Sequence, residues 1–564
     1  MTTNQLKTSA FKAIFTVIIL IAYKTLFGNY NASIGLMIAL SCISFLKFDF
    51  TLYPLYKVIE LTGLSSFLLV MSFLSGFNPL VGLIINMFTI FIVSYIYTNT
   101  SKNMVSYLFV FIYIYMIGIP VPLNLLPERF LSLLFGIFII IISQFLFNKN
   151  KFKNSCTTMI LDALHCMNEE IKNILENNYD KKDNLLIHNS LRNLLLLIND
   201  KNLNGIFSNA LNKPYFNIAI ILERLNTLIN KINMLEDVSF RKEYLKYLNY
   251  IICNIIGSIE NKNFNYKYVD FSYKCSDSHK ESKVIEECTN LIELLCLNVN
   301  TLNHPINTIK LDLKELFCNN HHIHINSLKF NFSFKISVAI SLSMFFIDKF
   351  NLINGKWMLI TIYVLMQPFI SETIVKTKKR IKGTIIGICL FVLIFGVLHT
   401  NIPSSLFLFF IFFVYFYATD YYVKVIFTCM LALSMNLTGD SLETLSTLRF
   451  SFIILGSLIS LLFSKYFLPF THSIHVNHLK DKYLELSSNM LSEFCDLLDG
   501  KGNEENLIKL ALDCNTIESS LLSISKTLND PSIEEFINNE YIVISHIRLS
   551  TLNFYHNKFK RSLI

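Results

Sequence analysis

The sequence predicts an all-α integral membrane protein with two six-helix transmembrane bundles, about 12 spans, each followed by a helical cytoplasmic domain. Three observations predict this class. Of the 564 residues, 52% are hydrophobic and only 16% are charged, whereas soluble domains carry roughly 25% charged residues. Apolar runs of membrane-spanning length recur along the chain, and basic residues gather in alternate short loops. Because so few charged side chains cannot cover a surface in water, most of the apolar excess must face lipid.

The first bundle is predicted over residues 1–149, where apolar stretches each approach the length of a membrane helix. They run over residues 10–27, 31–46, 58–76, 79–97, 104–120 and 129–147. The first stretch is expected to be a retained helix, because Phe27-Gly28-Asn29-Tyr30 offers a signal peptidase no small-residue cleavage site and further spans follow at once.

The second bundle is predicted over residues 331–468. Its apolar stretches lie near residues 332–350, 355–371, 383–399, 402–418, 422–438 and 448–467. Helical cytoplasmic domains are predicted at 150–330 and 469–564, because apolar residues recur there at steps of three and four.

Basic residues predict the orientation of the spans, because short cytoplasmic loops are enriched in Lys and Arg. With the N-terminus in the cytosol, the outside loops hold only Arg129, and the inside loops hold Lys47, Lys57, Lys102, Lys376, Lys378, Lys379, Arg380, Lys382 and Lys424. An even number of spans in each half returns both soluble segments and both termini to the cytosol. The 12 cysteines form no CxxC pair, which is typical of a reducing compartment. The expected location is a bacterial cytoplasmic membrane, crossed many times.

The two halves of the chain look like copies of each other. An Arg-Phe pair with a glycine seven residues after the arginine opens the sixth span at Arg129 and the twelfth at Arg449. A Phe-Lys pair opens the first span at Lys12 and the seventh at Lys335. The matched order and spacing predict a duplication with parallel repeats, related by an axis along the membrane normal.

The sequence carries no recognisable catalytic or nucleotide-binding motif. A GxxxxGK[ST] loop, a GxSxG elbow, an HExxH pair and a GxGxxG loop are all absent, so neither an enzyme nor a cofactor is expected. The most metal-like cluster is Cys318, His321, His322 and His324, but it lacks the paired spacing of structural zinc sites. A polar interfacial loop is the favoured interpretation there, and no metal site is predicted. The net charge of +8 indicates anchoring at the cytoplasmic side, and no nucleic-acid partner is expected.

The most informative residues lie in the eighth span and the loop that follows it. Trp357, the only tryptophan, and Thr361 lie on this span, and Gln367-Pro368 interrupts it. Proline frees a backbone carbonyl, which at membrane depth must be satisfied by protein or by a water-lined cavity. For Trp357, an anchor at the membrane interface is at least as favoured as a role in substrate binding.

Two further sets of residues are candidates in this region. Gly383, Thr384 and Gly387 place small residues at a spacing that lets two helices approach closely, so helix packing is the favoured role. Lys335, Lys379 and Arg380 would place positive charge at the inner mouth of the second bundle, where they would attract an anionic substrate.

At these residues the chain resembles the fusaric acid resistance and aromatic acid exporter superfamily. The membrane module of that superfamily reads W-x-x-x-T, a Q-P step, a threonine, and R-x-x-G-T-x-x-G. The matching residues here are Trp357, Thr361, Gln367, Pro368, Thr373, Arg380, Gly383, Thr384 and Gly387. The superfamily tends to place basic residues at the start of this module, where Lys335 stands. The first half matches less well, because it lacks the tryptophan, near Ile34, and the R-x-x-G-T motif.

The resemblance implies a secondary exporter of organic anions, such as aromatic carboxylic acids or toxic compounds, driven by an ion gradient or the membrane potential. One alternative is a passive anion channel built from the same module, since plant malate channels resemble it distantly. Another is a membrane scaffold, or an enzyme with an interfacial site, whose soluble helices recruit a partner. The expected partners are the lipid bilayer, a small organic anion and a second copy of the chain in a homodimer.

Overall fold

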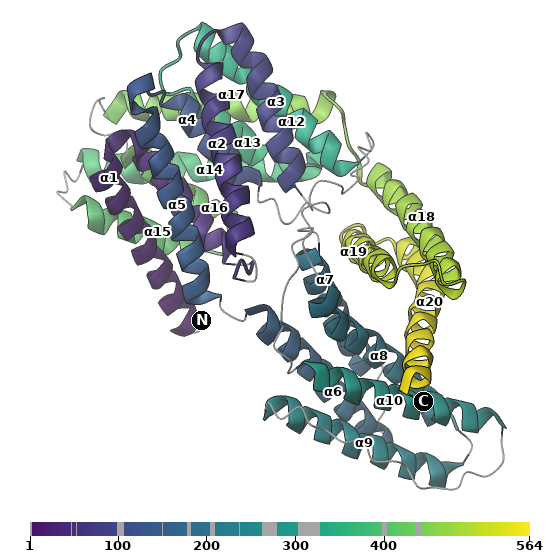
Figure 1. Cartoon of the computed structure of the whole chain (residues 1–564). Coiled ribbons are helices and arrows are strands. Elements are labelled where there is room, and N and C mark those ends of the chain that lie inside the picture. Colours follow the sequence, from purple (N-terminus) through teal and green to yellow (C-terminus); the bar gives the residue numbers. More distant parts are fainter. Residues whose placement is uncertain are drawn as a thin grey trace. The chain divides into compact units, whose positions relative to one another are not determined.

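The computed structural model describes residues 3–46, 48–51, 54–98, 106–148, 151–176, 182–202, 209–235, 237–261, 279–302, 327–397, 403–434 and 442–563. In these ranges the regular elements are helices and none is a β-strand, so the predicted all-α class is confirmed (Figure 1). The helices form two compact units. The first unit comprises Met1–Asn150 and Ile323–His475, and the second unit comprises Lys151–His322 and Val476–Ile564.

The first unit contains the apolar helices of both halves. They are α1 (Thr3–Phe45), α2 (Pro54–Ser75), α3 (Pro79–Tyr97), α4 (Ser106–Gly118), α5 (Leu126–Phe147), α12 (Leu328–Lys349), α13 (Lys356–Leu365), α14 (Ile370–Val392), α15 (Ser404–Tyr417), α16 (Tyr421–Ser434) and α17 (Leu442–Tyr466). Within the described residues, 6 helical runs are long and apolar enough to cross a membrane, and α4, α13, α15 and α16 are shorter apolar helices. The length and the apolar composition of these helices identify the chain as a membrane protein. The arrangement of 12 spans in two six-helix bundles remains a prediction.

Local signals in the sequence set the start of several helices. The Asn78 side chain accepts a hydrogen bond from the backbone N–H of Leu80 at the start of α3. The Ser327 hydroxyl accepts one from Phe330 at the start of α12. Such caps satisfy backbone donors that have no partner inside the helix.

Helix α1 consists of two arms that fold back on each other at Gly28. Gly28 has a φ of 71°, a conformation that side chains disfavour. The Phe11 ring, near the start of α1, lies 5.2 Å from the Phe147 ring at the end of α5. The Gln144 amide, also near the end of α5, donates to the carbonyl of Phe45 at 2.7 Å. Since both ends of α1 meet the same end of α5, the first two apolar stretches run antiparallel.

The two halves of the first unit interlock and repeat one packing detail. Helix α3 lies along α12, and α1 packs on α15 (Figure 1). A Cβ added to Gly136 of α5 would lie 2.2 Å from Ile38 of α1. A Cβ added to Gly456 of α17 would lie 2.9 Å from Thr361 of α13. The glycine that follows each Arg-Phe pair thus admits a neighbouring helix in both halves.

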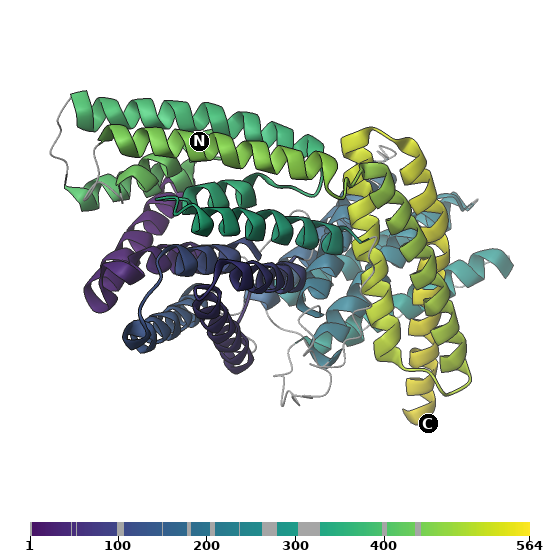
Figure 2. The ribbon, with the colours of Figure 1, turned by 90° about the horizontal axis from the view of Figure 1, so that it is seen from above.

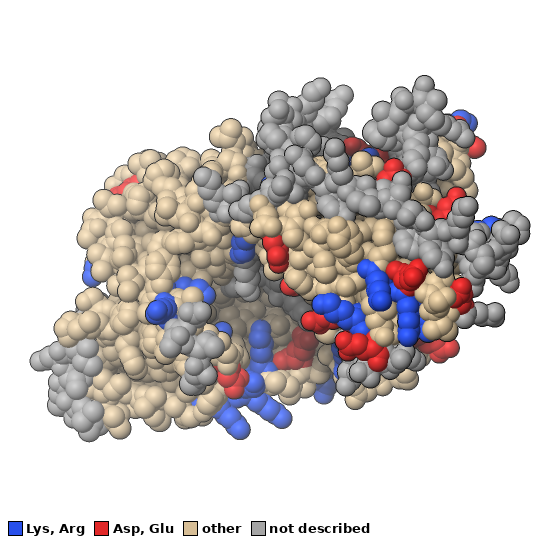
Figure 3. Space-filling view, turned by 90° about the horizontal axis from the view of Figure 1, so that it is seen from below, with Lys and Arg blue, Asp and Glu red and all other residues tan. Residues whose placement is uncertain are grey.

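The surface of the first unit exposes many large apolar side chains, among them Ile18, Ile84 and Phe138. Figure 3 shows broad areas without Lys, Arg, Asp or Glu beside areas where charged residues gather. Extended apolar surface is unfavourable in water and is expected where helices contact lipid. The described cysteines form no disulfide bond.

The second unit combines the two soluble segments. Its helices are α6 (Lys151–Leu175), α7 (Lys182–Asn202), α8 (Asn209–Asn233), α9 (Val238–Glu260), α10 (His279–Thr301), α18 (His472–Leu498), α19 (Glu504–Leu528) and α20 (Pro531–Leu563). Helices α18, α19 and α20 run alongside one another (Figure 2). Because α19 packs on α7 and α20 packs on α8, segments far apart in the sequence share one core.

Candidate functional site

Gln367 and Pro368 lie in a break that separates helix α13 from helix α14. The backbone N–H of Gln367 donates to the Thr373 hydroxyl at 3.1 Å, and the Gln367 side chain donates to the carbonyl of Met366 at 2.8 Å. Groups freed by the break are therefore satisfied inside the protein, as irregular backbone at membrane depth requires.

Helix α14 turns one polar face toward its neighbours. The buried residues of this face recur every three or four residues, apart from the adjacent pair Gly383 and Thr384, and they are Thr373, Thr377, Arg380, Gly383, Thr384, Gly387 and Phe391. Helix α14 packs on α16 and α17. Polar groups turned into the interior of a membrane unit either join helices or line a path for a substrate.

Gly383 and Gly387 bring α14 into close contact with α16. A Cβ on Gly383 would lie 2.9 Å from Val425, and one on Gly387 would lie 2.8 Å from the carbonyl of Ile426. Between them, the Thr384 carbonyl accepts a hydrogen bond from the Cys429 thiol at 3.9 Å. The Thr384 hydroxyl itself is buried without a hydrogen-bond partner.

A basic cluster surrounds the start of α16. Arg380 is buried and donates to the Tyr421 hydroxyl at 3.5 Å, while its Nε has no hydrogen-bond partner. Lys379 pairs with Asp420 at 3.0 Å near the surface. The Lys376 ammonium lies 5.6 Å from the centre of the Tyr421 ring. Positive charge therefore exceeds negative charge at this end of α14 and α16.

Arg449 of α17 is buried in the core of the first unit, although the sequence marked it only as part of the repeat. Its guanidinium carbon lies 5.0 Å from the centre of the Trp357 ring, and the Cys429 thiol of α16 interacts with it electrostatically. Tyr115 of α4 and Arg380 also act on it electrostatically. The Nε of Arg449 has no hydrogen-bond partner, and no carboxylate among the described residues pairs with it. Four helices thus converge on one buried cation.

The remaining predicted residues occupy separate places. Trp357 is only 3% exposed, so it lies in the core and not at the surface of the unit. Thr361 donates to the carbonyl of Trp357 at 2.7 Å and packs against Gly456. Lys335 is buried on α12, and no contact among the described residues joins it to Arg380.

Sequence reasoning missed Arg449 and its neighbours Cys429 and Tyr115 as site residues. An arginine inside an apolar span is itself a signal, because such residues are costly and face the bundle interior. The cysteine and the tyrosine carry no comparable signal.

Several predicted residues lie outside the described residues. These are Lys47, Lys102 and the cluster of Cys318, His321, His322 and His324. In the ranges that the structure does describe, no group of His, Cys, Asp or Glu could hold a metal ion.

Comparison with known protein families matches residues 340–463 to the family described as fusaric acid resistance protein-like. The match covers α13 to α16, the second half of α12 and most of α17, and it confirms the resemblance carried by the motif in α13 and α14. No curated protein and no solved structure matches the chain. The matched family indicates membrane transport or efflux as the general role.

Proposed function

We propose that the first unit exports organic anions, such as aromatic carboxylic acids or toxic compounds, as a secondary transporter. The observation that carries this proposal is the pair of buried arginines, Arg380 and Arg449, each with an Nε that has no hydrogen-bond partner. Burying a cation without a counter-charge costs free energy, so the arrangement favours the binding of an anionic ligand.

The proposed topology supplies the direction of transport. The chain crosses a bacterial cytoplasmic membrane in about 12 spans, with both termini and the second unit in the cytosol. The antiparallel arms of α1 support two spans within that helix. In this topology Lys376, Lys379 and Arg380 lie at the cytosolic entrance, where they concentrate anions.

The test uses inverted vesicles that contain the full chain, so that export appears as uptake. Uptake of radiolabelled aromatic carboxylates is measured with and without a proton gradient. Arg380→Ala is expected to lower uptake at least about tenfold, because the buried guanidinium is the first cation on the path. Lys378→Ala is the matched control, since this side chain is exposed on the same helix and its loss leaves the site intact.

Each outcome separates the candidate functions. Gradient-dependent uptake that Lys378→Ala keeps and Arg380→Ala loses supports the exporter. Uptake that persists without any gradient, with unitary conductance in a planar bilayer, assigns the same path to a passive channel. Folded protein that moves no anion by either route contradicts both and leaves the scaffold function, which deletion of residues 151–322 would then test.

A further inference from the structure

The arginines that open the matching spans, Arg129 and Arg449, have different surroundings. Both are buried. Arg129 donates from Nη1 to the carbonyl of Ile119 at 2.7 Å, from Nη2 to that of Tyr30 at 3.3 Å, and from Nε to the Asn31 side chain at 3.3 Å. These neutral acceptors join the turn of α1 to the ends of α4 and α5. Arg129 is therefore a hydrogen-bonded structural group.

Among the residues that the structure describes, no set of carbonyl acceptors surrounds Arg449 as it does Arg129. Its guanidinium lies on the ring of Trp357, at the position that corresponds to Ile34 in the first half. The face of an indole ring attracts the cation. It accepts no hydrogen bond from the guanidinium N–H groups, because these point outward in the plane of the guanidinium. The Cys429 thiol interacts with the Arg449 guanidinium electrostatically, and the buried Nε has no hydrogen-bond partner. In the described part of the second half, the arginine is thus present without the carbonyl acceptors that Arg129 has.

A second donor without a partner lies close by. Cys429 interacts electrostatically with Arg449 and donates a hydrogen bond to the carbonyl of Thr384, and the buried Thr384 hydroxyl has no partner of its own. The two unsatisfied donors are therefore linked through a single cysteine. The missing group must accept hydrogen bonds and carry negative charge, because no described carboxylate pairs with Arg449.

We propose that Arg449 and Thr384 bind the carboxylate group of the transported compound, and that Arg129 is the structural counterpart, so that each chain has one such site. A carboxylate suits the site because its two oxygens match the planar edge of a guanidinium. This assignment rests on the proposed function in one respect, namely that the carboxylate compound bound at Arg449 and Thr384 is also the compound that is transported.

The same geometry limits what the site recognises. Trp357 is buried and already in contact with the Arg449 guanidinium, so its ring is not free to stack on a ligand. The site therefore recognises the carboxylate and not an aromatic ring. Aliphatic and aromatic carboxylates of similar size are expected to bind with affinities within about tenfold of each other.

The test uses Trp357 as a built-in probe, because it is the only tryptophan in the sequence. The purified full chain in detergent is excited at the red edge, where tyrosine does not absorb, and titrated with cyclohexanecarboxylate. A saturable change in fluorescence is expected, and none with the neutral cyclohexanecarboxamide. Radiolabelled benzoate, displaced by cyclohexanecarboxylate, compares the aromatic with the aliphatic acid.

The variants separate binding from folding. Arg449→Gln is expected to raise the dissociation constant at least about tenfold, and Thr384→Val to raise it less. Arg449→Lys keeps the charge but loses the planar edge, so intermediate binding is expected. Arg129→Lys should lower the melting temperature while leaving the fluorescence response in place.

Several results would overturn the assignment. They are no response in folded wild-type protein, an unchanged response in Arg449→Gln, and an equal response to chloride at the same concentration. If the protein binds carboxylates but does not transport them in vesicles, the result contradicts the proposed function and is consistent with this binding site. If Arg449→Gln transports normally, the result contradicts this binding site and is consistent with the proposed function.

Discussion

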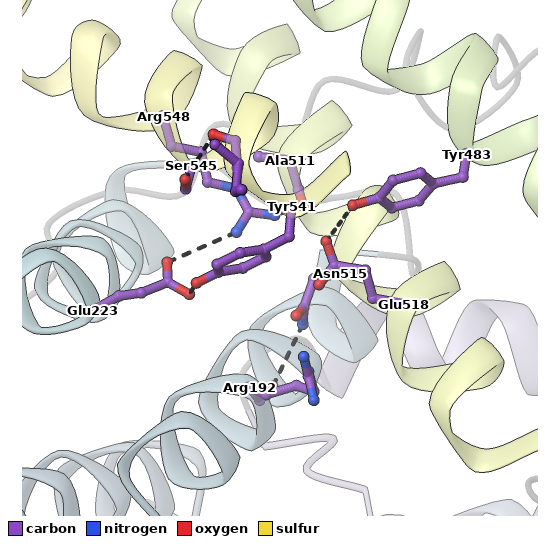
Figure 4. A network of polar contacts seen from close by, with 10 residues as sticks. Arg192, Glu223, Tyr483, Ala511, Asn515, Glu518, Tyr541, Ser545 and Arg548 are labelled. Carbon is purple, nitrogen blue, oxygen red and sulfur yellow. Dashed lines mark hydrogen bonds and ion pairs between the residues drawn. The ribbon is translucent and has the colours of Figure 1, made fainter. Parts of the chain in front are cut away.

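In the second unit, Arg548 of α20 is buried between carboxylates from two other helices (Figure 4). Its Nη1 lies 3.9 Å from Oε2 of Glu223 in α8, and its Nη2 donates to the carbonyl of Ala511 at 2.9 Å. Tyr541 donates to Glu223 as well. Burial alone would lower the pKa of Arg548, but attraction from Glu518 and Glu223 outweighs it and raises that pKa. One cation therefore balances the buried carboxylate of Glu518 and the partly buried carboxylate of Glu223.

Replacing Arg548 with methionine is expected to lower the free energy of unfolding by about 3–5 kcal/mol, because it leaves buried carboxylates without a counter-charge. Chemical unfolding of the full chain, followed by circular dichroism, measures this. Lys526→Met removes an exposed cation from α19 and should change stability by no more than about 0.5 kcal/mol. Equal effects of the two substitutions would contradict the role of Arg548.

The pH dependence of stability tests Glu518. Burial raises the pKa of this carboxyl above its ordinary value of 4.5, and Arg548 and the hydrogen bond from Tyr483 offset the rise only in part. The folded chain then binds more protons than the unfolded chain between the two pKa values, so this group makes stability fall as pH rises through that window. Melting temperatures of wild type and Glu518→Gln across this range should show a flatter dependence in the variant. Parallel curves would show that Glu518 titrates alike in both states.

At the scale of helices, the distance between α14 and α16 depends on glycine. A Cβ on Gly387 would lie 2.8 Å from a backbone oxygen of α16, and backbone cannot turn aside as a flexible side chain can. Helix α14 also carries Arg380 and Thr384, so a shift of this helix moves the proposed path. Packing and transport are therefore coupled in this element.

Gly387→Val is expected to lower stability by about 1–3 kcal/mol and to lower anion uptake with it. Gly63→Ala is the matched control, because Gly63 is exposed on α2 with nothing near its missing Cβ. Alanine there should leave uptake unchanged and stability equal or higher by about 0.5–1 kcal/mol. Melting temperature and vesicle uptake are compared for both variants, and an unaffected Gly387→Val would show that α14 and α16 can separate freely.

At the scale of the whole molecule, the two soluble segments share one unit although residues 323–475 separate them in the sequence. Lys213 of α8 pairs with Glu504 of α19 at 2.6 Å, and the Asn199 side chain of α7 donates to the carbonyl of Leu512 at 3.4 Å. Each half of the first unit continues into one of these segments. Contacts within the second unit therefore tie the two halves of the chain together.

A zero-length carbodiimide reagent is expected to cross-link Lys213 to Glu504 within one chain, because the two groups form a partly exposed ion pair. Mass spectrometry of digested full-length protein identifies the linked peptides. Lys213→Gln removes the reactive amine and should abolish the product. A product found only between different chains would contradict the shared unit.

The sequence by itself determined the helical class, the membrane character and the family resemblance of the second half. These follow from local properties: the length of apolar runs, the spacing of apolar residues, and a motif confined to residues 357–387. The break at Gln367-Pro368 is local for the same reason, because proline disrupts the helix in which it stands.

Only the tertiary structure decided which residues meet. Arg129 and Arg449 begin the same motif, yet Arg129 donates to backbone carbonyls whereas Arg449 lies against the indole ring of Trp357. Likewise, Trp357 is buried because α17, α12 and α4 pack against α13, which no spacing along α13 reveals. Hydrogen bonds and cation–π contacts form between helices that are distant in the chain, so they depend on how the helices pack and not on any one segment.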